Sequence, residues 1–155
     1  MKEEDLEPLR RALNEKCGLT EEDFVPKIHI DVPMPISYAS RELAKELERL
    51  EPFGVGNPKP LFAQKDLVFV AGSYLGKNKN FARFQVRDEK GGRFSLVFFG
   101  NLSAFGEFLD AKYGQGSKDA LFEGRGEFPV SITYQLGLNT FRGRTELQFV
   151  MQDYC

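Results

Sequence analysis

Basic and aromatic side chains gather between residues 74 and 93 in a pattern that could bind nucleic acid. In the stretch FARFQVR (81–87), Ala82, Phe84 and Val86 are apolar residues suited to a core. In an extended chain these three side chains point to one face, and the residues between them point to the other. That face would carry Phe81, Arg83, Gln85 and Arg87. An exposed ring can stack on a base, while guanidinium groups reach phosphates and also stack. Neighbouring residues of the same chemistry are Tyr74, Lys77, Lys79, Lys90 and Arg93.

A second basic stretch, NTFRGRT (139–145), lies far along the chain. It repeats the same combination of one aromatic and two cationic side chains, Phe141, Arg142 and Arg144. The two stretches can act together only if the fold brings them to one surface.

The elements that would position these residues follow from a change of period. After residue 63 apolar residues alternate, which predicts strands over 67–75, 81–89, 93–100, 128–139 and 145–153. NLSAFGEFLDAKYG (101–114) predicts a helix between the third and fourth strands. This order is that of a mainly β fold, the five-stranded OB barrel, whose strand 2–3 face and strand 1–2 and 4–5 loops bind oligonucleotides. The basic stretches at 76–80 and 139–145 fall in those two loops.

The chain before residue 64 has a different character. DLEPLRRALNEKCG (5–18) and SYASRELAKELERLEPF (37–53) predict helices, the second with Ser40 as its N-cap, and VPKIHIDVPMPI (25–36) predicts a short strand. We therefore expect a small α/β appendage over 1–51, a rigid connector over 52–63 and an OB domain over 64–155. LEPFGVGNPKPLFA (50–63) is a poor phosphate loop, because Pro58 and Pro60 lack amide donors and the stretch leads out of a helix.

Composition excludes several classes of function. With one histidine, His29, and two distant cysteines, Cys17 and Cys155, the chain has too few ligands for a Cys/His metal site or a conventional catalytic triad. We expect no catalytic residues, no cofactor and reduced thiols. No apolar run reaches the roughly 20 residues that span a bilayer, so we expect a soluble, cytoplasmic protein without a membrane partner.

The charge distribution leaves alternatives open. The net charge is −2, and residues 52–155 are only mildly basic, with 13 basic and 10 acidic side chains. Alternating Arg and Gln can simply keep the outer face of a barrel solvated, and the same face could dock a protein. The placement of both basic stretches in the two expected binding loops favours nucleic acid.

Three segments resemble the C-terminal region of the bacterial RecJ single-strand-specific exonucleases. LERLEPFGVGNPKPLFA is similar to the family segment L-x-P-F-G-x-G-N-P-x-P-x-F that leads from the DHH-associated domain into the OB domain. VPKIHIDVPMPIS is similar to the strand before it, and LNTFRGRTELQFVMQD to the last hairpin. The Asp and His motifs of the DHH nuclease core, and the Gly-Gly-Gly-His motif of the associated domain, are missing.

The resemblance implies a non-catalytic part of a 5′–3′ exonuclease that acts in DNA repair and recombination. It is either an excised domain or a natural relative without the core. The family OB domain is understood to hold single-stranded DNA and guide it to the nuclease channel. The implied partners are single-stranded DNA, the nuclease core of the same or a companion chain, and a single-strand-binding protein. Manganese or magnesium would serve only the missing core.

Overall fold

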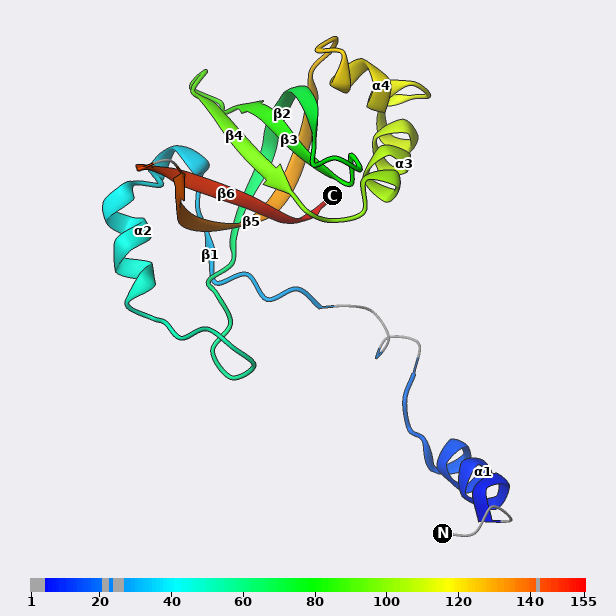
Figure 1. Ribbon diagram of the computed structural model, residues 1–155. Coiled ribbons are helices and arrows are strands. Elements are labelled where there is room, and N and C mark those ends of the chain that lie inside the picture. The colour runs from blue at the N-terminus through cyan, green and yellow to red at the C-terminus, as the bar shows by residue number, and fades with distance from the viewer. Residues whose placement is uncertain (1–4, 21–22, 24–26, 142) are drawn as a thin grey trace.

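The computed structural model describes residues 5–20, 23, 27–141 and 143–155 (Figure 1). Its elements, in chain order, are α1 (Leu6–Lys16), β1 (Val32–Pro33), the 3-10 helix η3 (Ile36–Tyr38), α2 (Arg41–Glu48), β2 (Phe62–Leu75), β3 (Phe81–Arg87), β4 (Arg93–Phe98), α3 (Leu102–Tyr113), α4 (Ser117–Phe122), β5 (Phe128–Phe141) and β6 (Arg144–Tyr154). Among the described residues, no helix is long and apolar enough to cross a membrane.

Strands β2 to β6 close into the predicted five-stranded barrel. β2 pairs antiparallel with β3, and β3 pairs antiparallel with β4. β4 pairs parallel with β6, and β6 pairs antiparallel with β5. β5 then returns to β2 and closes the barrel. The closure removes the free edges that five separate strands would expose.

β2 begins at Phe62, five residues before the predicted start. Its first half pairs with β5 and its second half with β3, and the strand is irregular between Gln64 and Leu67. Asp66 lies within that irregularity with a φ of 50°. The bulge interrupts the alternation of apolar residues, which is why the sequence pattern shows only the second half of the strand.

Alternation places the core as the sequence predicts. Ala82, Phe84 and Val86 of β3 are fully buried, and the inward residues of β5 are buried from Phe128 to Leu136. α3 and α4 cover one part of the barrel, where Phe105, Leu109 and Leu121 join the core. The helix predicted over 101–114 is confirmed, with Asn101 accepting hydrogen bonds from the Ser103 and Ala104 amides at its start. α4 was not predicted.

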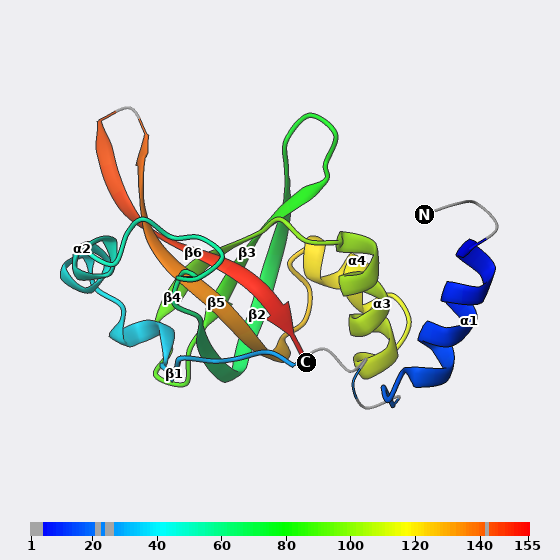
Figure 2. The same cartoon turned by 90° about the horizontal axis from the view of Figure 1, so that it is seen from below.

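Residues 31–48 pack directly on the barrel. β1 pairs parallel with the start of β2, and Ile36 and Ala44 belong to the core. The predicted N-cap of α2 is confirmed, because the Ser40 Oγ accepts from the Leu43 amide. α2 contacts β5 and β6, and it lies beside the β5–β6 hairpin in Figures 1 and 2. The division of the chain at residues 51 and 63 stays a prediction.

A buried tyrosine joins this segment to the barrel and provides a test of the packing. Tyr134 of β5 is fully buried and donates a 2.9 Å hydrogen bond to the Met34 carbonyl, and burial raises the pKa of its phenol well above the usual value. Tyr134→Phe would leave that carbonyl without its donor, so we expect a loss of about 1–2 kcal/mol in the free energy of unfolding, measured by urea denaturation. Tyr38→Phe, at an exposed ring, is the control and should change stability little.

The side-chain amide of Asn57 holds the Pro/Gly connector in a turn. Asn57 Nδ2 donates to the carbonyls of Leu50 and Pro52, at 2.7 and 3.1 Å, and the backbones of Gly54 and Asn57 pair with each other. The turn therefore has internal hydrogen bonds, in keeping with a structural role for this stretch. α1, by contrast, is the predicted helix but buries none of its residues.

Candidate nucleic-acid interface

The outer face of β3 and β4 carries the predicted polar residues in register. Arg87 lies opposite Arg93, Gln85 opposite Ser95, and Arg83 opposite Val97. Directly opposed residues share a face, and β3 alternates exposed and buried positions along its length. The side chains of Phe81, Arg83, Gln85 and Arg93 are exposed, and that of Arg87 is half-buried. Val97, in the middle of this face, is 94% buried and gives it an apolar floor.

Among the described residues, Arg83 and Arg93 on this face and Lys77 in the adjoining β2–β3 loop have no carboxylate partner within ion-pair distance. Arg87 differs, because its guanidinium pairs with Glu127 at 2.7 Å. The unpaired cations remain available to an anionic ligand.

Glu127 therefore competes with any phosphate for Arg87. Glu127→Gln removes the competing charge at a half-exposed pair, so stability should change by no more than about 1 kcal/mol. If single-stranded DNA reaches Arg87, affinity should rise about fivefold at 0.1 M salt, because one phosphate contact adds about 0.7 to the salt slope. Fluorescence anisotropy with a labelled oligonucleotide, repeated at several salt concentrations, measures both the affinity and the salt slope. An unchanged salt slope would show that the strand does not reach Arg87.

Two aromatic pairs flank the loop between β2 and β3. Phe81 and Phe99 meet edge to face with ring centroids 5.1 Å apart, and their exposed fractions are 38% and 52%. Tyr74 is stacked on Phe122 of α4 at 4.2 Å, with the Lys79 Nζ 5.8 Å from the Tyr74 ring centroid. One face of Tyr74 is therefore covered, so its ring anchors the loop as well as facing solvent. Phe122 could not be found from the sequence, since the stretch 114–127 shows no clear period.

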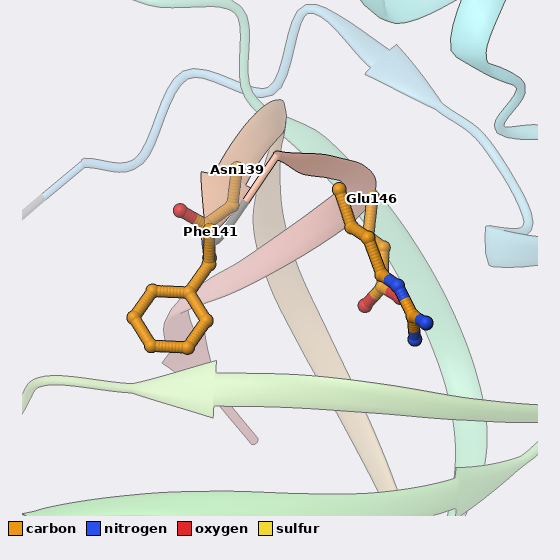
Figure 3. Close-up of a pocket in the computed structure, with 4 residues that line it drawn as sticks. Asn139, Phe141 and Glu146 are labelled. Carbon is orange, nitrogen blue, oxygen red and sulfur yellow. The ribbon is translucent and has the colours of Figure 1, made fainter.

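The second basic stretch forms the tip of the β5–β6 hairpin. Phe141 lies opposite Arg144, and Asn139 opposite Glu146, so these four side chains share one face. They line a hollow of about 510 Å³, which we call the hairpin hollow. Figure 3 shows Phe141 and Glu146 extending in the same general direction from its two strands. Arg142 lies outside the described residues. Asn139 and Glu146 were not predicted as site residues.

The outer face and the hairpin belong to one continuous surface. β4 pairs with β6, with Val97 opposite Val150, so the outward residues of β4 continue onto β6 and its hairpin. Figure 2 shows the β2–β3 loop and the β5–β6 hairpin projecting from the same side of the barrel. The fold thus brings the two basic stretches to one surface. That the individual residues contact DNA stays a prediction.

Comparison with protein families identifies the barrel. The family model of the RecJ OB domain matches residues 30–153. The chain belongs to the RecJ OB domain family. The single-stranded-DNA-specific exonuclease RecJ of Bacillus subtilis (strain 168) is 29% identical over an alignment of 155 positions that covers 99% of this chain. The chain spans only 18% of the length of that relative.

Solved structures that match this RecJ OB domain are more distant. Two crystal forms of Rim1, a mitochondrial single-stranded DNA binding protein from S. cerevisiae, match with TM-scores of 0.40 and 0.37. Their sequence identities are 13% and 9%. The first match covers 61% of this chain and 91% of the Rim1 chain, and the second covers 60% and 89%.

The family assignment agrees with the resemblance seen in the sequence, since the matched range includes the connector and the last hairpin. Among the described residues, no group of three or more His, Cys, Asp or Glu side chains could hold a metal ion. Cys17 and Cys155 are both free thiols in the structure.

Proposed function

We propose that this RecJ OB domain binds single-stranded DNA on the outer face of β3 and β4 and on the β5–β6 hairpin, and that it does not itself cleave DNA. The observation that carries the proposal is the set of unpaired cations and exposed rings on one surface between two projecting hairpins. Cations would hold the phosphates, and Phe81, Phe99 and Phe141 would stack on bases. The name of the Bacillus subtilis relative adds support, because it describes an enzyme specific for single-stranded DNA.

The proposed role rests on the family to which the chain belongs. The chain matches 18% of the RecJ exonuclease and belongs to its OB family, so the proposed partner is a nuclease core in the same or a companion chain. The OB domain would hold the strand and deliver its 5′ end to that core, in the cytoplasm where the DNA is found. Binding through guanidinium groups and rings requires no metal, so we propose no cofactor for this chain.

Binding to labelled oligonucleotides tests the proposal. A fluorescein-labelled mixed-sequence 15-mer should bind with an affinity that falls as salt rises, with a log–log slope of roughly −3 to −4 if five cations contact phosphates. EDTA should leave the affinity unchanged. A duplex of the same sequence should bind more weakly, because its bases are not free to stack. No binding up to 100 µM (roughly the weak non-specific range) would reject the proposal.

A second candidate function is protein docking, and one observation favours it. Ile28, Ile30 and Val32 are each about half exposed, and Ile28 and Ile30 line an apolar hollow of about 450 Å³ beside the C-terminal end of β6. Such a surface suits a protein partner, for which we propose the nuclease core or a single-strand-binding protein. An Ile28→Asp, Ile30→Asp variant would lose binding to a purified core while keeping its affinity for DNA.

A further inference from the structure

The hairpin hollow contains a carboxylate and an amide that the binding of phosphates does not require. A carboxylate repels phosphate, and Glu146 points from the same hairpin face as Arg144. Within the described residues, the side chains of Asn139 and Glu146 have no hydrogen-bond or ion-pair partner. On the opposite face of the hairpin, the Thr140 and Thr145 hydroxyls lie 2.9 Å apart and satisfy each other. The polar side chains without a partner therefore lie on the hairpin face that forms the hollow.

The four residues around the hollow match the parts of a nucleotide. Phe141 offers a ring that is 66% exposed, and Arg144 offers a cation directly across the strand pair. One pair further from the tip, Asn139 and Glu146 place an amide and a carboxylate side by side. The volume of about 510 Å³ falls within the range of about 300–1,000 Å³ that small-ligand clefts have. A stacked base would thus meet Asn139 and Glu146 at its edge.

The chemistry of that edge selects among bases. A carboxylate only accepts hydrogen bonds, whereas an amide both donates and accepts. Cytosine, adenine and guanine carry an exocyclic amino group that can donate to a carboxylate. Thymine carries a carbonyl oxygen in place of the amino group of cytosine. Its one donor on this edge, the N3–H, lies between two carbonyl oxygens, so a carboxylate that accepted from it would also lie against a carbonyl oxygen. The pair therefore favours an amino-bearing base.

We propose that the hairpin hollow binds one amino-bearing base of the single strand, stacked on Phe141 with its amino group donating to Glu146. Asn139 completes the contact at the neighbouring ring nitrogen, and Arg144 holds the adjacent phosphate. The proposal rests on the proposed function, since it describes how one position of the bound strand is recognised. It predicts a base preference on a surface whose phosphate contacts carry none.

Deoxycytidine and deoxyuridine 15-mers are the matched probes, because their bases differ in an amino group against a carbonyl oxygen. Fluorescence anisotropy at fixed salt should show dC15 binding at least about fivefold more tightly than dU15 to the intact chain. Glu146→Ala should bring the ratio of the two affinities below about twofold. Glu89→Ala removes a carboxylate of the exposed β3–β4 turn and is the charge-matched control, which should leave the ratio unchanged.

Each outcome decides between the two proposals. Equal affinities for dC15 and dU15 would overturn the base preference and leave single-strand binding intact. A preference that survives in Glu146→Ala, or that Glu89→Ala abolishes equally, would overturn the assignment to the hollow. No binding of either oligonucleotide would reject the proposed function and the inference with it. Circular dichroism and thermal melting of each variant confirm that the barrel is folded.

Discussion

Replacing Arg83 and Arg144 together by alanine is expected to weaken the binding of a single-stranded 15-mer about 25-fold at 0.1 M salt. Each phosphate contact on a single strand adds about 0.7 to the slope of log K against log salt, which is roughly fivefold per contact at this concentration. The two side chains come from opposite parts of the surface, the outer face of β3 and the β5–β6 hairpin. Neither has an acidic partner among the described residues, so their removal should disturb the fold little.

The salt dependence distinguishes this result from a general loss of structure. The slope of the double variant should be less steep by about 1.4 than that of the unaltered chain. Lys45→Ala with Lys112→Ala removes the same charge from exposed positions on α2 and α3 and is the matched control. If the control weakens binding as much as the arginine variant does, the surface between the hairpins is not the binding site.

Replacing Phe84 by alanine is expected to lower the free energy of unfolding by about 3–5 kcal/mol. Phe84 is fully buried in β3 and packs against four other rings, with centroid distances of 5.2 Å to Phe69, 6.4 Å to Phe98, 5.0 Å to Phe105 and 5.9 Å to Phe122. Alanine would leave a cavity where β3 meets α3 and α4. Denaturation in guanidinium chloride measures the change.

Two further variants serve as controls for the Phe84→Ala result. Phe99→Ala removes an equally large ring from the exposed outer side and should cost less than about 1 kcal/mol, since little apolar surface is buried there. Phe84→Leu retains most of the volume and should fold even if Phe84→Ala does not. A loss below about 1 kcal/mol for Phe84→Ala would mean that the ring cluster is not the centre of the core.

Contacts with residues far along the chain reduce the availability of two predicted site residues. Arg87 was predicted to be a DNA-binding residue, and the structure pairs it with Glu127, 40 residues further along the chain. Tyr74 was also predicted to be a DNA-binding residue, and Phe122 covers one face of its ring. Both partners lie in or beside the stretch 114–127, which has no periodic pattern. Asn139 and Glu146 were missed because a lone amide and a lone carboxylate carry no signal until they face each other.

The amino-acid pattern was enough to predict five strands, the helix between the third and fourth, and the face on which Phe81, Arg83 and Gln85 lie. This was possible because alternation is a local property, which can be recognised within a strand of about five to seven residues. Three features came from the folded chain alone. β2 pairs with both β3 and β5, Glu127 pairs with Arg87, and the two basic stretches share a surface (Figure 2). Those facts depend on the register between strands far apart in the chain, and no local pattern encodes that register.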